Sequence, residues 1–328
     1  MCTAVYLNKG DKGGVFFGRT LDYDFSYGEE VVITPRNFPF SFRGMGECAK
    51  HFAFIGTAKV LDGYPLYYDA MNEKGLYIAG LNFVGNARYS EGGKGKGEIA
   101  QFELIPYLMC KCASVDGVIY ELSKAVITGT PFNKEMPTAQ LHYLVADKDR
   151  CITVECVKDG LKLYENPVGV LTNNPPFDYQ LFNLNNYRNV TAAERSSDFG
   201  GGVQLDAYSR GMGGMGLPGD WSSQSRFVRA AFASANSTET VGENDGVMQF
   251  FHVLNTAFQP CGICQVGQGQ EKTIYSSCVS PQTGRYYYST YESFGVCAVE
   301  FEGKDGNELV RYPHKAVGAT VVNAKKNK

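Results

Sequence analysis

Long apolar runs are missing from this chain of 328 residues. No segment reaches the roughly 18 consecutive apolar residues that a membrane-spanning helix needs. The start of the chain also lacks the basic and apolar regions of a signal peptide, since Lys9, Asp11 and Lys12 interrupt it early. We therefore expect a cytoplasmic protein without stable membrane insertion.

A surplus of basic residues is also absent. The chain has 31 Lys and Arg and 34 Asp and Glu, which gives a net charge of −3. Nucleic acid is therefore not expected as a partner, and the basic run 325–328 is typical of a solvated tail. Histidine is scarce, and no metal-binding H-E-x-x-H motif occurs. We predict no metal and no cofactor; the four histidines, expected at the surface or satisfied in the core, are His51, His142, His252 and His314.

Two short motifs lack the context that their usual chemistry requires. Cys261 and Cys264 form a C-x-x-C, but no second pair has zinc-site spacing and no βαβ unit surrounds them. Gly211–Gly216 matches G-x-G-x-x-G without a strand before it or a helix opening at its third glycine. A structural cysteine pair and a turn cluster are favoured, while a C-x-x-C redox protein stays open as an alternative. The ten cysteines are expected to be mostly buried, reduced thiols.

Short β-branched and aromatic segments outnumber helical ones. Strands and helices do not alternate, which favours antiparallel sheets with helices packed outside over a parallel sheet. No linker interrupts the chain, so one domain over residues 1–328 is expected, with a long loop at Phe199–Gly219. The predicted strands are Thr3–Leu7, Gly14–Thr20, Val31–Thr34, Phe52–Gly56, Leu76–Leu81, Leu141–Ala146, Ile152–Val157, Gly169–Leu171, Thr273–Ser277, Gly284–Thr290 and Gly295–Phe301. The predicted helices are Ile99–Cys112, with a possible kink at Pro106, Ser114–Val126, Asp178–Tyr187, Ser222–Asn236 and Asn244–Phe258.

Cys2 is the most informative residue, because it directly follows Met1. Removal of Met1 would leave a thiol and a free α-amine on the same residue. Such an amine ordinarily has a pKa of about 8 and a thiol one of about 8.5. The amine can then serve as the base that a nucleophilic thiol otherwise takes from another side chain. We therefore expect Met1 to be removed, and Cys2 to be a nucleophile unless its position is an accident of where the chain begins.

Two charged residues are predicted to lie beside Cys2. If Thr3–Leu7 and Gly14–Thr20 form a hairpin, Arg19 returns close to Cys2, and Asp22 follows three residues later. A guanidinium next to a thiol favours the thiolate, and a carboxylate can orient the α-ammonium. The alternative is a surface ion pair after a strand.

Three further polar residues complete the candidate site. Asn82 and Asn173 each end a predicted strand, where Asn usually forms turns but can also donate to a reacting carbonyl oxygen. Arg226 lies in the first turn of the predicted helix Ser222–Asn236, where a cation opposes the helix dipole. That local conflict suggests another purpose for Arg226.

Six short stretches of the chain form one pattern. They are Met1-Cys2-Thr3, Phe17-Gly18-Arg19-Thr20-Leu21-Asp22-Tyr23, Asn72-Glu73-Lys74-Gly75-Leu76, Gly80-Leu81-Asn82-Phe83, Leu171-Thr172-Asn173-Asn174-Pro175-Pro176-Phe177 and Leu217-Pro218-Gly219-Asp220-Trp221-Ser222-Ser223-Gln224-Ser225-Arg226-Phe227. Together they resemble the choloylglycine hydrolases, a family of N-terminal-nucleophile hydrolases that includes bile salt hydrolases and penicillin V acylases. They run in the family's order from residue 1 to beyond Arg226.

The resemblance implies an α+β fold of four αββα layers, with two stacked antiparallel sheets between helices. It also implies hydrolysis of glycine- or taurine-conjugated bile salts through a thioester, without a cofactor, in a homotetramer. The resemblance also bears on the subtype, because bile salt hydrolases of this family typically have Asn at the position of Asn82, whereas penicillin V acylases of the standard group have Tyr. The implied catalytic set is Cys2 as nucleophile and proton shuttle, Arg19 and Asp22 flanking it, Asn82 and Asn173 in the oxyanion region, and Arg226 in the polar network.

An apolar pocket should hold the acyl group. Its expected walls are the loops Phe25–Tyr27, Val60–Leu66 and Thr128–Pro137. A penicillin V acylase, another N-acyl amide hydrolase or an acyltransferase remains the alternative within the enzymes. A non-catalytic sterol-binding relative is the alternative outside them.

Overall fold

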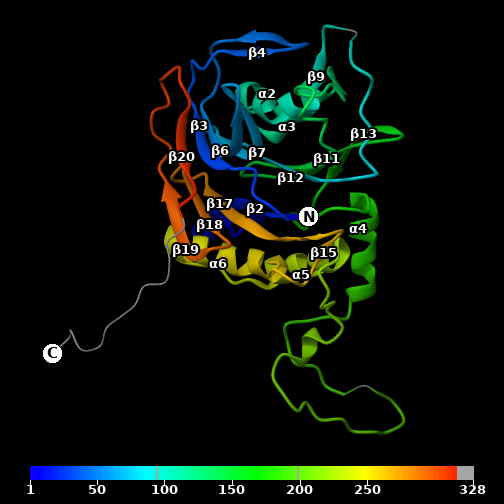
Figure 1. Cartoon of the computed structure of the whole chain (residues 1–328). Coiled ribbons are helices and arrows are strands. Elements are labelled where there is room, and N and C mark those ends of the chain that lie inside the picture. The colour runs from blue at the N-terminus through cyan, green and yellow to red at the C-terminus, as the bar shows by residue number, and fades with distance from the viewer. Residues whose placement is uncertain (94, 198, 316–328) are drawn as a thin grey trace, which may run out of the picture.

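Figure 1 shows four layers in the computed structural model, which describes residues 1–93, 95–197 and 199–315. Two large antiparallel sheets lie face to face, and helices cover the outer face of each. This is the αββα arrangement predicted above. The basic run 325–328 lies outside the described residues.

The six-stranded sheet carries the N-terminus and has the order β14-β1-β2-β17-β18-β19. A single helical turn, α1 (Gly10–Gly13), joins β1 to β2 as the predicted hairpin connection. Gly18 lets β2 approach β17 closely, because a Cβ there would lie 1.9 Å from the carbonyl oxygen of Ser277. The strands are β1 (Cys2–Asn8), β2 (Val15–Tyr23), β14 (Val170–Leu171), β17 (Lys272–Ser280), β18 (Arg285–Thr290) and β19 (Ser293–Val299).

The eight-stranded sheet has the order β13-β12-β11-β8-β7-β6-β3-β20. Each of the eleven predicted strands overlaps a strand of one of the two sheets, but β7, β13 and β20 were not predicted. The strands of this sheet are β3 (Glu30–Thr34), β6 (Phe54–Leu61), β7 (Tyr64–Asn72), β8 (Tyr77–Asn82), β11 (Leu141–Ala146), β12 (Cys151–Val157), β13 (Gly160–Glu165) and β20 (Val310–Pro313). Smaller pairs are β4 (Phe40–Phe42) with β5 (Gly46–Cys48), β9 (Glu98–Ala100) with β10 (Val126–Thr128), and β15 (Gln265–Val266) with β16 (Gly269–Gln270).

The helices form the two outer layers (Figure 1). Apolar side chains of α5 and α6 pack against the six-stranded sheet, and those of α2 and α3 pack against the eight-stranded sheet. The helices are α2 (Leu104–Lys111), α3 (Val115–Leu122), α4 (Phe177–Asn183), α5 (Ser223–Asn236) and α6 (Glu243–Leu254). Short 3-10 turns are η1 (Gln101–Glu103), η2 (Leu184–Tyr187), η3 (Met212–Gly214) and η4 (Asn255–Ala257). No helix in the described ranges combines the length and the hydropathy needed to cross a membrane.

Four helix predictions were partly wrong. Those for α4 and α6 extend too far, because the chain continues after these helices as the 3-10 turns η2 and η4. The first predicted helix begins five residues late, at Leu104, so Pro106 lies in its first turn, where a missing N–H breaks no helical hydrogen bond and no kink is needed. The second has the predicted Ser114 cap, which accepts from the Gly117 N–H at 3.3 Å, but it ends at Leu122. Val126, which was predicted to be helical, begins β10 instead, because this β-branched run pairs with β9.

Candidate active site

The hairpin of β1 and β2 brings Cys2 and Arg19 together. Cys2 is paired with Leu21 and Ala4 with Arg19, so the side chains of Cys2 and Arg19 lie on the same face of the sheet. Arg19 Nη2 lies 2.7 Å from Cys2 Sγ, and both residues are buried. The predicted proximity of Arg19 to Cys2 is thus present in the structure.

The guanidinium of Arg19 is held by backbone carbonyl groups of the facing sheet. Arg19 Nη1 donates to the carbonyl oxygens of Tyr68, at 3.2 Å, and of Gly80, at 2.5 Å. Burial works against the charge, but the nearby Cys2, Tyr275 and Asp69 outweigh it and raise the pKa of Arg19. Arg19 is therefore a permanent cation fixed against the sulfur.

Asp22 lies near Cys2, but its carboxylate does not face the sulfur. Since it is an odd number of residues from Arg19, its side chain points to the opposite face of β2. There it accepts from Thr273 Oγ1 at 2.7 Å, from Thr20 Oγ1 at 3.1 Å and from Gln259 Nε2 at 3.2 Å. Arg226 Nη1 lies 4.0 Å from the same carboxylate.

Met1 occupies the position beyond Cys2 in this structure. Its ammonium donates to the backbone carbonyl of Asp22 at 2.5 Å and to Glu271 Oε1 at 3.1 Å, while its carbonyl accepts from the Asp22 N–H at 2.8 Å. The Cys2 nitrogen is therefore an amide here, and it donates to Asn173 Oδ1 at 3.0 Å. The α-amine beside Asp22 and Glu271 belongs to Met1, and Glu271 was not anticipated from the sequence.

Asn173 and Arg226 hold the backbone of Cys2 from the other side. Asn173 Oδ1 also accepts from Arg226 Nη2 at 2.7 Å, and Arg226 Nη1 donates to the Cys2 carbonyl at 2.6 Å and to Thr3 Oγ1 at 2.7 Å. Burial lowers the pKa of Arg226, although Asp22 and Cys2 oppose this effect. Arg226 is fully buried and reaches back across the start of α5, which explains a cation at that end of the helix.

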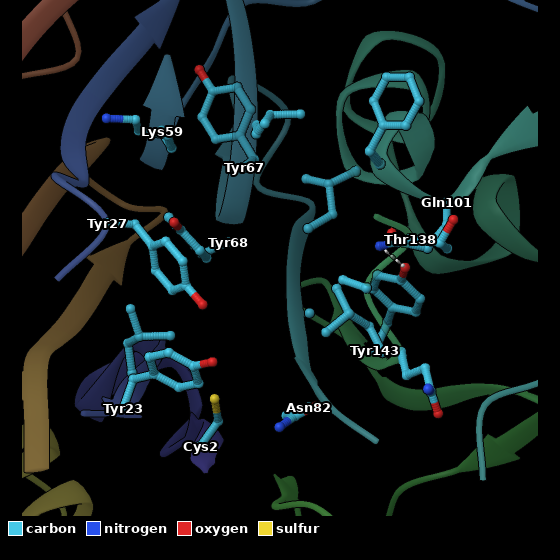
Figure 2. A pocket seen from close by; sticks show the side chains of 18 of the residues that line it. Cys2, Tyr23, Tyr27, Lys59, Tyr67, Tyr68, Asn82, Gln101, Thr138 and Tyr143 are labelled. Carbon is cyan, nitrogen blue, oxygen red and sulfur yellow. Dashed lines mark hydrogen bonds between the residues drawn. The ribbon is translucent and has the colours of Figure 1, made fainter. Parts of the chain in front are cut away.

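Asn82 ends β8 beside the same site. Its backbone carbonyl accepts from Asn173 Nδ2 at 2.7 Å, so the two asparagines are in direct contact. Figure 2 shows Asn82 and Cys2 at the same end of a pocket, with the amide of Asn82 turned toward the sulfur. The five other residues predicted from the sequence therefore lie around Cys2, although the Asp22 carboxylate faces away from the sulfur.

The end of β14 is held by a buried histidine. The ring of His142 stacks on that of Phe83, with centroids 4.2 Å apart. Its Nδ1 lies 2.9 Å from Glu155 Oε1, and its Nε2 lies 2.9 Å from the carbonyl oxygen of Thr172. This agrees with the expectation of a satisfied core histidine. By fixing Thr172, His142 fixes the residue that precedes Asn173.

A pocket of about 420 Å³ opens at the Cys2 sulfur. Figure 2 shows Tyr23, Tyr27 and Tyr68 on the side of Cys2, and Gln101 and Tyr143 on the opposite side. Its size and mainly apolar lining suit a small-molecule acyl group. Further lining residues include Leu21, Lys59, Leu66, Tyr67, Val84, Phe102, Ile105, Phe132, Met136, Pro137, Thr138 and Leu141.

The predicted pocket walls are only partly right. The segment Thr128–Pro137 contributes Phe132, Met136 and Pro137, and the segment Phe25–Tyr27 contributes Tyr27. Phe25 itself is half exposed. The segment Val60–Leu66 is not a loop but the tip of the β6–β7 hairpin, because its two ends pair as strands, and it contributes Leu66.

The two short motifs lie outside the pocket lining. Cys261 and Cys264 lie in a turn after η4. All ten cysteines lie within the described ranges, and all are free thiols. Gly211–Gly216 contains η3 and has no strand before it, as the turn interpretation predicted. Among the described residues no cluster of three metal ligands occurs.

Known proteins share both the sequence and the shape of this chain. Residues 2–311 match the model of the linear amide C–N hydrolases, choloylglycine hydrolase family. A bile salt hydrolase/transferase of Lactiplantibacillus plantarum is 50% identical over 316 residues, which cover 95% of this chain and 97% of that protein. A bile salt hydrolase/transferase of Clostridium perfringens is 34% identical over 320 residues, covering 96% and 97%.

Solved structures agree with this result. A variant of the conjugated bile acid hydrolase from Clostridium perfringens superposes with a TM-score of 0.90 at 32% identity, covering 98% of this chain and 99% of that one. The penicillin V acylase from Agrobacterium tumefaciens has the same fold, with a TM-score of 0.74 at 21% identity and coverage of 96% and 92%. The chain that places Cys2 at the end of an apolar pocket belongs to the choloylglycine hydrolase family of linear amide C–N hydrolases.

Proposed function

We propose that this protein hydrolyses the amide bond of glycine- or taurine-conjugated bile salts, with Cys2 as the nucleophile after Met1 has been removed. The observation that carries this proposal is the contact between Arg19 Nη2 and Cys2 Sγ, at 2.7 Å, at the end of an apolar pocket. The curated relatives named above are bile salt hydrolases, which supports the choice of acyl group.

The first step is attack of the Cys2 thiolate on the amide carbonyl, which forms the C–S bond and places negative charge on oxygen. The amide of Asn82 and the second N–H of Asn173 Nδ2, whose first is taken by the Asn82 carbonyl, are the proposed donors to that oxygen. One such donor is typically worth about 3 kcal/mol in the transition state. Arg19 balances the thiolate before the attack.

The second step is departure of glycine or taurine. After removal of Met1, the α-amine of Cys2 takes the thiol proton, and the resulting ammonium protonates the leaving nitrogen as the C–N bond breaks. The nitrogen of Cys2 lies 3.0 Å from Asn173 Oδ1. Arg226 is proposed to fix Asn173 and the Cys2 carbonyl, and Asp22 to hold the surrounding hydroxyl groups. Water then attacks the thioester and gives its proton to the amine. The C–S bond breaks, the free bile acid leaves, and the Cys2 thiolate and α-ammonium are restored.

Acyl transfer is a second candidate activity of the same thioester. Relatives that are 50% and 34% identical are named hydrolase/transferase, and an amine in place of water would give transfer. Adding an amino acid such as phenylalanine to the bile salt reaction and looking for the new conjugate by mass spectrometry tests this activity.

The decisive experiment is an assay of the Met1-free protein with glycocholate, taurocholate and penicillin V, scored by the amine released. We expect release from one or both bile salts, and none by a folded Cys2→Ala variant. Turnover of penicillin V alone would show that the protein is a penicillin V acylase and not a bile salt hydrolase. No turnover of any of the three would favour a non-catalytic sterol-binding protein. The homotetramer stays a prediction, which light scattering tests.

A further inference from the structure

A second buried charged group, Asp69, lies behind Arg19. Asp69 belongs to β7 in the eight-stranded sheet, yet its hydrogen-bond donors come from the six-stranded sheet. Tyr275 OH donates to it at 3.0 Å, Tyr286 OH at 3.0 Å and Ser277 Oγ at 3.2 Å. Three converging hydroxyl donors can stabilise a carboxylate that has no exposure to water.

The same groups connect Asp69 to Arg19. Ser277 Oγ, which donates to Asp69, also accepts from the backbone N–H of Arg19 at 3.2 Å. The carbonyl of Tyr68, the residue before Asp69, accepts from Arg19 Nη1 at 3.2 Å. Asp69 and Arg19 are therefore linked in two ways across the sheets: the carboxylate through Ser277 to the Arg19 backbone, and the guanidinium to the backbone carbonyl next to Asp69. The other side of the guanidinium contacts Cys2 Sγ.

Asp69 can change its charge in the neutral range. Burial raises the pKa of Asp69 to about 6, while Arg19 and the hydroxyl donors oppose the shift. Burial also raises the pKa of the surrounding tyrosines, so they stay neutral near pH 7. The charged or titratable groups around Asp69 are Arg19 of β2, Tyr67 of its own strand, Tyr77 of β8, Tyr275 of β17 and Tyr286 of β18.

We propose that Asp69 is a positioning residue that shares the charge of Arg19 with Cys2 and thereby sets the pH range in which Cys2 is a thiolate. Asp69 is not among the residues that line the pocket, so it acts through Arg19 and not on the substrate. When Asp69 is ionised, it neutralises part of the guanidinium charge, and the thiolate becomes less favourable. When Asp69 is protonated, Arg19 stabilises the thiolate alone. The inference rests on the proposed role of Cys2 as nucleophile.

The test is the rate at which iodoacetamide alkylates Cys2 in the Met1-free protein, followed across pH by mass spectrometry of the N-terminal peptide. Replacing Asp69 by Asn removes the competing charge. The midpoint of the Asp69→Asn profile is therefore expected roughly one pH unit below that of the wild type. Asp147→Asn, at a mostly buried carboxylate that caps α3 through Val115, is the matched control and should leave the profile unchanged. A purely structural role would not move this midpoint.

A second variant keeps the proposal testable if Asp69→Asn does not fold. Tyr286→Phe removes one donor to Asp69 and keeps Asp69 protonated to higher pH, so a smaller shift in the same direction is expected. A midpoint that is unchanged or raised in the folded variants overturns the proposal. Because alkylation needs no substrate, a shifted profile without bile salt turnover would reject the proposed substrate and keep the role of Asp69.

Discussion

Arg19 and Cys2 are 17 residues apart in the sequence, but the guanidinium Nη2 lies 2.7 Å from the sulfur because β1 and β2 are neighbours in one sheet. Arg19 is completely buried, and its Nε and Nη1 donate to backbone carbonyl groups. A charged hydrogen bond in such a place is stronger than one in water. The reactivity of the thiol should therefore depend on this cation.

Arg19→Gln is expected to slow alkylation of Cys2 at pH 7 by at least about tenfold, which corresponds to about 1.4 kcal/mol. Hydrolysis should fall by a similar or larger factor, since the thiolate is the attacking group. Stopped samples analysed by mass spectrometry give the alkylation rate. Arg36→Gln is the matched control, because Arg36 pairs with Glu73 and Asp305 away from the pocket. Equal rates in Arg19→Gln and the wild type would contradict this prediction.

Retention of Met1 should abolish activity without unfolding the protein. In the structure the Cys2 nitrogen is an amide, which cannot act as a base, and Met1 extends the pairing of β1 with Asp22. A leader sequence that a protease removes directly before Cys2 would test this. We expect no turnover before cleavage and full turnover after it, with similar circular dichroism spectra. A C-terminal tag of the same length is the control, and activity of the uncleaved protein would reject the amine as base.

Asn82→Tyr should change which acyl group is preferred. Asn82 lies beside Cys2 at the end of the pocket. The larger side chain of tyrosine would therefore narrow the space next to the reacting carbonyl of the substrate. We expect the ratio of kcat/KM for glycocholate over penicillin V to fall by about tenfold or more, within the range for a changed pocket contact. Thr138→Ser, in the same pocket lining, is the control. An unchanged ratio would remove the argument that Asn82 determines the substrate.

The six candidate site residues could be named from the sequence because the stretches that contain them resemble one family. The structure brings these residues together, and their catalytic roles stay a prediction. Arg19 could be placed beside Cys2 from the hairpin alone, since a hairpin pairs neighbouring segments. Asp22 shows the limit of that reasoning. Asp22 was correctly expected near Cys2. Because side chains alternate along β2, however, its carboxylate points to the opposite face and contacts Thr273 and Gln259.

Residues contributed by distant strands could not be predicted. Asp69 lies in β7, which was missed because a central Asp and a Pro near the start both weaken the strand pattern. Its function depends on Tyr275 and Tyr286, more than 200 residues later in the chain. Such contacts are set by how the two sheets pack, and local periodicity carries no information about them.

His314 should make the stability of the fold depend on pH. Its ring stacks on Tyr288, with centroids 4.4 Å apart, and its Nε2 is buried with no hydrogen-bond partner among the described residues. Burial lowers the pKa of His314 to about 4, from an ordinary value near 6.5. The unfolded chain therefore takes up a proton at a pH where the folded protein does not. The stability that neutral His314 provides is fully present above about pH 6.5 and is lost as the pH falls toward 4.

The variant His314→Phe keeps the stacked ring and removes the titration. Between pH 7.5 and pH 5 the free energy of unfolding should therefore fall by about 2 kcal/mol more in the wild type than in His314→Phe. Urea unfolding followed by fluorescence at the two pH values measures both differences, and other titrating groups such as Asp69 cancel because both proteins contain them. His252→Asn is the control, since His252 is exposed on α6 and should leave the wild-type pH dependence unchanged. An equal loss of stability in the wild type and His314→Phe would show that His314 is protonated in the folded protein at pH 5.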